Sequence, residues 1–119
     1  MQLWEILVPC SFDIEFEKSN LKVEVYRIVD NNNRKKEAML AHHKRWDEVV
    51  RKMAGGLTIL KSAKGHWVSE ESEIFIEDMI PVRIACSKKT ISKIAQFTKE
   101  YYKQKKVMFY QVSEEVHFI

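Results

Sequence analysis

Glycine, proline and cysteine are scarce in this chain. Its 119 residues include three glycines, two prolines and two cysteines, and all three glycines fall within residues 55–67. A chain uses glycine where the backbone needs a positive φ or must approach another group closely. Backbone geometry therefore constrains the sequence most at residues 55–67, and we expect the best candidate site there.

Long apolar runs and a strong charge of one sign are also absent. No apolar run approaches the ~18 residues that a membrane-spanning helix needs. Residues 1–6 lack a basic segment and include an acid, Glu5, so they predict a first strand and not a signal peptide. The net charge of +3 is too small for the basic stripe typical of nucleic-acid-binding proteins. We expect one cytoplasmic domain over residues 1–119, with neither a membrane nor a nucleic acid as partner.

Hydrophobic periodicity predicts a mixture of strands and helices. Apolar residues occupy both alternating sets of the first strand, Trp4 to Val8, which is typical of a central strand. Residues 12–29 predict an inserted β-hairpin, with a short helix over its second half as the alternative. Further strands are expected at 57–60, 73–77, 82–86, 107–112 and 116–119.

Two helices are predicted between these strands. The first carries an apolar stripe from Met39 to Met53, widened by Leu40 and Val49, and ends at Gly55-Gly56. The second covers residues 88–104, with Ser87 as its N-cap. Because proline cannot donate a ladder hydrogen bond, we expect a bulge or break at Pro81.

The order of these elements predicts the fold. Strand, hairpin insertion, helix, strand, strand, helix, strand is the βαββαβ order of the ferredoxin-like α+β sandwich, which carries both helices on one face of the sheet. The second face is expected to be apolar and to favour homo-oligomerisation, unless the hairpin at 12–29 folds over it. Its predicted residues are Leu3, Leu7, Met108, Tyr110 and Val112.

A candidate ligand site follows from Gly65-His66-Trp67, where we expect a second backbone irregularity. An indole beside glycine can form a flat wall for a heterocycle, and freed backbone N–H groups can bind an anion. A hairpin whose Trp67 covers the core is the alternative. Glu77 is the candidate catalytic acid, since the sheet could draw its carboxylate inside and raise its pKa. Gln104 could add an amide for ligand recognition.

Metal and redox sites have weaker support in the sequence. His42 and His43 share a helix with Asp47, but no second ligand pair has matching spacing, so we expect neither a metal nor a cofactor. We expect the first and third sheet strands to be neighbours running the same way, which would bring Cys10 and Cys86 together. Two packed thiols and a redox-active or metal-binding pair both remain open.

The whole βαββαβ pattern resembles the PII/CutA-like group of small trimeric proteins. From residue 40 onward the chain also resembles a set of small bacterial and phage proteins with a Gly-Gly-x-Thr, Gly-x-Trp, Glu series, here Gly55 to Thr58, Gly65 to Trp67 and Glu77. The resemblance implies a shared fold and a homotrimeric assembly.

A second resemblance is to phage S-adenosylmethionine lyases, which share the trimeric architecture. It is carried by His42-His43, Gly56-Leu57, Glu77 before residues 82–84, and an aromatic after Gly65. It implies a ligand held between subunits and an important glutamate, Glu77; the aromatic is Trp67 where that family has tyrosine.

Three functions follow as hypotheses. The first is a homo-oligomeric PII-like protein that binds a small nucleotide-like ligand at a subunit interface. The second is a lyase acting on S-adenosylmethionine, and the third is a structural or protein-binding module.

Overall fold

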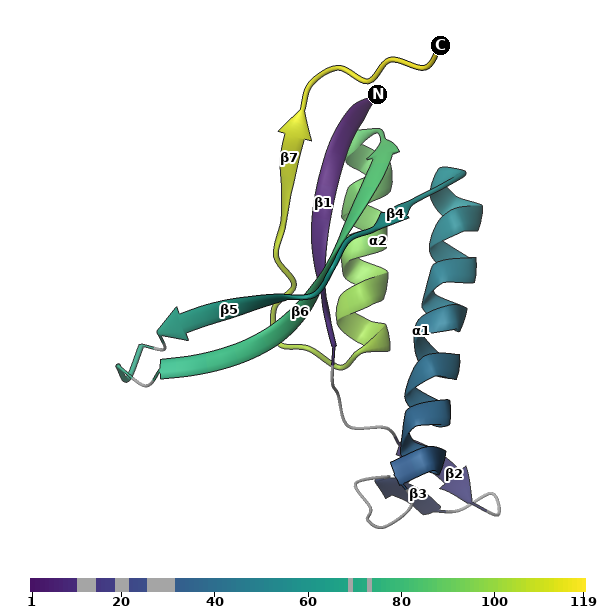
Figure 1. Ribbon diagram of the computed structural model, residues 1–119, viewed down its shortest axis with the longest axis vertical. Helices are drawn as coiled ribbons and strands as arrows, with labels where there is room; N and C mark the ends of the chain where they lie inside the picture. Colours follow the sequence, from purple (N-terminus) through teal and green to yellow (C-terminus); the bar gives the residue numbers. More distant parts are fainter. Residues whose placement is uncertain (11–14, 19–21, 26–31, 69, 73) are drawn as a thin grey trace.

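The computed structural model describes residues 1–10, 15–18, 22–25, 32–68, 70–72 and 74–119. The description of side chains also leaves out residues 15–18, 22–25, 32–36, 67, 75 and 76. Two helices and seven strands lie in the described residues (Figure 1). They are β1 (Gln2–Pro9), β2 (Glu15–Lys18), β3 (Lys22–Val25), α1 (Asn32–Ala54), β4 (Thr58–Ile59), β5 (Ala63–Val68), β6 (Ile74–Cys86), α2 (Lys88–Tyr101) and β7 (Phe109–Ser113).

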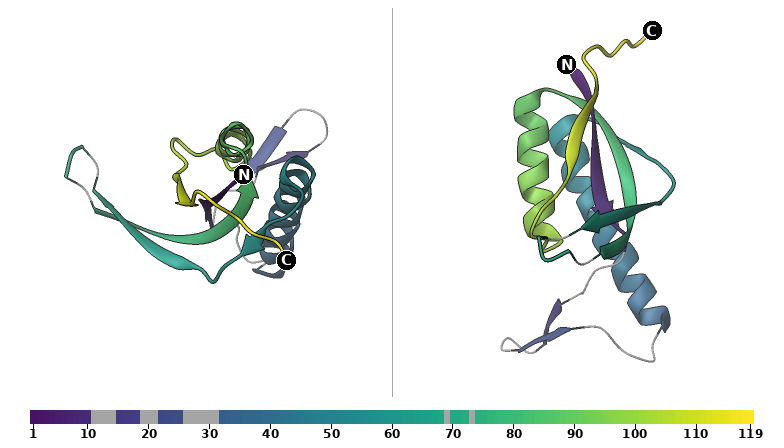
Figure 2. Two further views of the ribbon diagram at one scale, coloured as in Figure 1. Left: turned by 90° about the horizontal axis from the view of Figure 1, so that it is seen from above. Right: turned by 90° about the vertical axis from the view of Figure 1, so that its left-hand side faces the viewer.

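The main sheet is antiparallel and has five strands. Its order is β4-β6-β1-β7, and β5 pairs with the first half of β6. Both helices cover one face of this sheet (Figure 2). The protein is therefore an α+β protein, and its arrangement is consistent with a ferredoxin-like fold.

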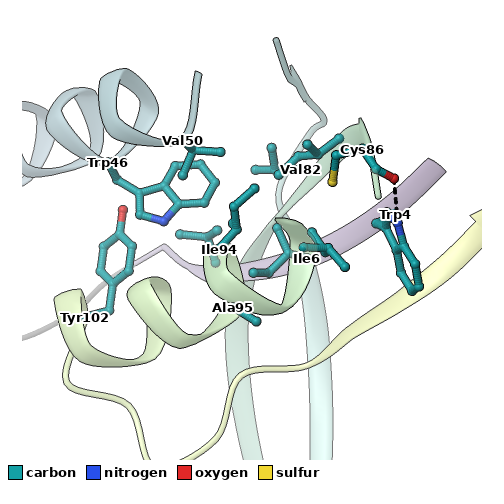
Figure 3. Close-up of a cluster of buried hydrophobic side chains, with 12 residues drawn as sticks. Trp4, Ile6, Trp46, Val50, Val82, Cys86, Ile94, Ala95 and Tyr102 are labelled. Carbon is teal, nitrogen blue, oxygen red and sulfur yellow. Dashed lines mark hydrogen bonds between the residues drawn. The ribbon is translucent and has the colours of Figure 1, made fainter. Parts of the chain in front are cut away.

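The core lies between the sheet and the two helices (Figure 3). The alternation predicted for the first strand is confirmed: Trp4, Ile6 and Val8 are buried toward the helices. The indole N–H of Trp4 donates to the carbonyl oxygen of Cys86 at 3.1 Å, which ties β1 to the end of β6. The rest of the core is Trp46, Val50, Val82, Ile84, Cys86, Ile91, Ile94, Ala95 and Tyr102.

Helix α1 is less buried than its apolar stripe predicted. Trp46 and Val50 are buried, but Leu40 is 56% exposed. Leu40 lies about 100° around the helix from Met39, away from the face that carries Trp46 and Val50. The prediction that Leu40 widens the buried stripe is therefore wrong.

The predicted start of the second helix and the predicted stop of the first are confirmed, whereas α2 ends at Tyr101 and the predicted end at residue 104 is wrong. Ser87 is the N-cap of α2, and its hydroxyl accepts a hydrogen bond from the backbone N–H of Thr90. Helix α1 ends at Ala54, and Gly55 follows with φ +87° while its N–H donates to the carbonyl of Arg51. This is the left-handed position at which helices often stop.

Substitution of Gly55 should be more costly than substitution of its neighbour. Gly55→Ala should lower the free energy of unfolding by about 1 kcal/mol, because a Cβ disfavours positive φ. Gly56→Ala is the matched control, since neither position has atoms within 4 Å of an added Cβ and no positive φ is recorded at Gly56. Urea denaturation of both variants measures the difference, and equal losses would contradict the assignment.

The strand containing Pro81 is not broken, so that prediction is wrong for β6 itself. The register with β1 continues through Leu7↔Pro81. The irregularity lies instead in the strands that pair with β6 on this side, where residues 60–62 separate β4 from β5. The N–H of Leu60 donates to the carbonyl of Pro81, and a strand residue directs its C=O and N–H to the same side. The missing N–H of Pro81 therefore faces the gap between β4 and β5.

The inserted hairpin is confirmed for the strands described. β2 and β3 pair antiparallel, with Glu15 opposite Val25 and Lys18 opposite Lys22. They lie beyond the N-terminal end of α1 and away from the second sheet face (Figures 1 and 2). The prediction that the hairpin folds over the second face is therefore wrong for β2 and β3.

The last residues do not form the short strand predicted at 116–119. The chain leaves the sheet after β7 and passes the ends of the strands (Figure 1). Phe118 is 80% exposed there.

Candidate functional site

The predicted ligand residues lie in a two-stranded ribbon, formed by β5 and the first half of β6, that projects from the sheet (Figure 1). Gly65, His66 and Trp67 occupy the middle of β5 and pair in regular register with Glu77, Ile76 and Phe75. The predicted irregularity at Gly65 is therefore wrong. The turn comes later, in the polar stretch around Glu70 and Glu71.

The register brings Gly65 and Glu77 together and separates His66 from them. Directly opposed residues share a face of an antiparallel pair, and successive residues alternate between faces. Gly65 and Glu77 therefore lie on one face of the ribbon, whereas His66 lies on the other. The side chain of Trp67 lies outside the description, although its backbone pairs with that of Phe75.

Glu77 is exposed, so the prediction that the sheet draws its carboxylate inside is wrong. No helix of the described residues covers the ribbon (Figure 2). A catalytic role for Glu77 remains a prediction.

Gln104 is engaged locally at the end of α2. Its side-chain amide donates to the carbonyl of Tyr102, and its backbone N–H donates to the carbonyl of Lys99. These contacts close the helix end and do not join Gln104 to the ribbon.

The two cysteines are at opposite ends of the sheet. β1 and β6 are antiparallel, with Cys86 opposite Gln2, whereas the N–H of Cys10 donates to the carbonyl of Asp78. Cys10 lies eight positions beyond Gln2, which places the two about 26 Å apart along the strand. The expectation that these strands run the same way is wrong, and so is the proximity derived from it. Both thiols are free, and burial raises the pKa of each.

His42 and His43 join the two helices. The ring of His42 stacks on that of Tyr101 with centroids 3.9 Å apart, and the Tyr101 hydroxyl donates to the backbone carbonyl of His42. His43 Nε2 lies 3.3 Å from the carbonyl oxygen of Cys10, and its Nδ1 lies 2.7 Å from the Tyr102 hydroxyl. Because a carbonyl can only accept, Nε2 carries the proton and Nδ1 accepts from Tyr102.

This cluster holds neutral imidazoles. Burial lowers the pKa of both His42 and His43. Burial also raises the pKa of Tyr102 far above its ordinary value. Both nitrogens of the His43 ring are already engaged, so the cluster serves to pack α1 against α2 and is not poised for acid–base catalysis.

Lowering the pH should reduce the free energy of unfolding through His42 and His43. Their pKa values are lowered on folding, so the unfolded chain binds protons more readily than the folded one. Their contribution to stability is complete above the unfolded pKa of about 6.5 and is lost as the pH falls through the folded values. Denaturant titrations at pH 8 and pH 5 should show a smaller pH-dependent loss in the variant His42→Gln/His43→Gln than in the wild type. An equal loss in both proteins would contradict this account.

No metal site emerges from the part of the chain that the structure describes, since no three His, Cys, Asp or Glu side chains there are grouped to hold an ion. Within the same residues, neither helix combines the length and apolar character that crossing a membrane requires.

The structure also reveals a buried acid that sequence reasoning missed. Glu5 is 7% exposed at the centre of β1, and because it alternates with the core residues Trp4 and Ile6 it lies on the face opposite the helices. Arg83 Nε donates to its Oε1 at 3.0 Å, and the Tyr110 hydroxyl donates to its Oε2. Both partners lie directly across from Glu5 in the register. An acid within an apolar central strand was the available signal, because a buried carboxylate needs partners.

No protein-family model, curated protein or solved structure matches the chain.

Proposed function

We propose that the protein is a PII-like, ferredoxin-like homo-oligomer, with a trimer favoured, that binds a small nucleotide-like ligand where subunits meet. The strand order and the placement of both helices on one face support this architecture. Free cysteines at opposite ends of the sheet fit a cytoplasmic protein.

The projecting ribbon carries the proposal. Val68 is 71% exposed and Ile74 is 70% exposed near its turn. A two-stranded ribbon is marginally stable in water and gains stability by packing against another surface. A second subunit supplies that surface, and it also closes a site that is open in one copy.

The residues of the ribbon suit a nucleotide-like ligand. Gly65 leaves the face bearing Glu77 free of a side chain at that position, so a flat group can approach the backbone. The indole of Trp67 can stack on a heterocycle, and the exposed His66 can hydrogen-bond a ribose or phosphate.

Thermal unfolding with a panel of nucleotides tests the proposal. Saturating ATP, ADP, AMP or cyclic AMP should raise the unfolding midpoint by a few degrees, because a ligand of the folded state stabilises it. Gly65→Val should abolish the shift without breaking the strand, since valine favours strands. Ser62→Ala, an exposed change between β4 and β5, is the control that should retain the shift. A panel without any shift would refute nucleotide binding.

A lyase acting on S-adenosylmethionine is the second candidate, favoured by the exposed position of Glu77 opposite Gly65. Mass spectrometry after incubation should then detect loss of S-adenosylmethionine, and Glu77→Gln should stop it. Unchanged substrate at high protein concentration would remove this candidate.

A further inference from the structure

The face of the sheet without helices carries two charged groups that a single copy cannot bring together. Arg83 and Glu77 are six positions apart on β6, so both lie on this face. At ~3.3 Å per residue they are about 20 Å apart along the strand, far beyond the reach of a salt bridge.

Each group retains capacity for a partner. Within the described residues, Glu77 makes no hydrogen bond or ion pair, and its side chain is exposed. The side chain of Arg83 is 44% exposed, and in the same part of the chain its ion pair is with Glu5 through Nε. A guanidinium has five N–H donors, so Arg83 can serve Glu5 and a second carboxylate together.

Apolar side chains of β1 and of residues 108–112 lie on the same uncovered face as Arg83. Leu3 and Leu7 are half-buried, while Met108, Tyr110 and Val112 are exposed. Exposed apolar side chains gathered on one sheet face mark an interaction surface. Glu77 and Arg83 carry opposite charges at two places on this face. The face of one copy is therefore complementary in charge to the same face of a second copy.

We propose that a second copy of this chain covers this face, with Glu77 of each copy paired with Arg83 of another. A symmetric assembly forms the pair once per subunit, because the same two patches meet at every contact. The partner then contributes a guanidinium to the Glu77 site, which is incomplete in one copy. This inference rests on the proposed function in that it takes the ribbon site to lie between subunits.

Sedimentation equilibrium of the full chain tests the pairing with two adjacent acids. Glu77→Lys should raise the dissociation constant of the assembly by about tenfold or more, because it places like charges together. Asp78→Lys is the matched control: Asp78 is also exposed but faces the other side of the ribbon, and its substitution should change the dissociation constant little. Added salt should weaken the wild-type assembly more than the Glu77→Gln assembly.

A second variant protects the test against misfolding at Arg83. Arg83→Gln keeps a hydrogen-bond donor for Glu5. If Arg83 and Glu77 pair between copies, the effects of Arg83→Gln and Glu77→Gln on the dissociation constant should not add in the double variant. Additive effects, or equal effects of Glu77→Lys and Asp78→Lys, would overturn the pairing. A wild type that stays monomeric would also overturn it, whereas a nucleotide-induced thermal shift in that monomer would leave ligand binding in place.

Discussion

Ile84→Ala should lower the free energy of unfolding by about 2–5 kcal/mol. Ile84 is fully buried on β6, opposite Trp4 of β1, in the layer that joins the sheet to the helices. The smaller side chain loses the transfer free energy of the missing carbons, and the rigid neighbours leave a cavity. Urea denaturation followed by circular dichroism measures the loss.

Ile59→Ala is the matched control for this change. Ile59 lies on the edge strand β4, pairs with Val82 and is 55% exposed. The same atoms are removed, but most of them already contact water, so the loss should stay below about 1 kcal/mol. Equal losses at Ile84 and Ile59 would contradict the position of the core.

Removal of Arg83 should be the second large effect. Arg83→Met should lower the free energy of unfolding at pH 7 by about 1–3 kcal/mol, because it leaves the carboxylate of Glu5 buried with one partner fewer. The partners of Glu5 are Arg83 and Tyr110, and the side chain of Glu5 is 10% exposed. Chemical denaturation at several protein concentrations separates this loss from any effect of assembly, because only the contribution of assembly depends on concentration.

A second arginine in the chain provides a control of the same chemistry. Arg51 Nε donates to Asp47 at 2.7 Å on the exposed surface of α1. Arg51→Met should cost no more than about 0.5 kcal/mol, because water solvates the remaining carboxylate. The double variant Glu5→Leu/Arg83→Met should recover most of the loss, since it removes the buried charge itself. A double variant as unstable as Arg83→Met would show that the lost contacts of Arg83, and not the stranded charge, cause the loss.

Local patterns predicted the elements that depend on neighbouring residues. The alternation in β1, the N-cap at Ser87 and the helix stop at Gly55 are all confirmed. Each depends on period, capping chemistry or backbone freedom within a few residues, so the sequence holds the information directly.

Predictions about distant residues were less successful. Leu40 lies next to the apolar stripe of α1 in the sequence, but its burial depends on whether another element contacts that side of the helix. Gly65 suggested a turn, yet strand pairing with β6 keeps it extended, and the turn forms several residues later.

The sequence by itself determined the α+β class, most elements, and an apolar second face of the sheet. Only the tertiary structure decided that β1 and β6 run in opposite directions, which separates Cys10 from Cys86 and sets Arg83 across from Glu5. Strand direction and register result from contacts between residues far apart in the chain, and the periodicity of one strand carries no record of its partner. Glycine is scarce in this chain, and pairing between the strands β5 and β6 places one of its three glycines, Gly65, opposite Glu77 on a projecting ribbon.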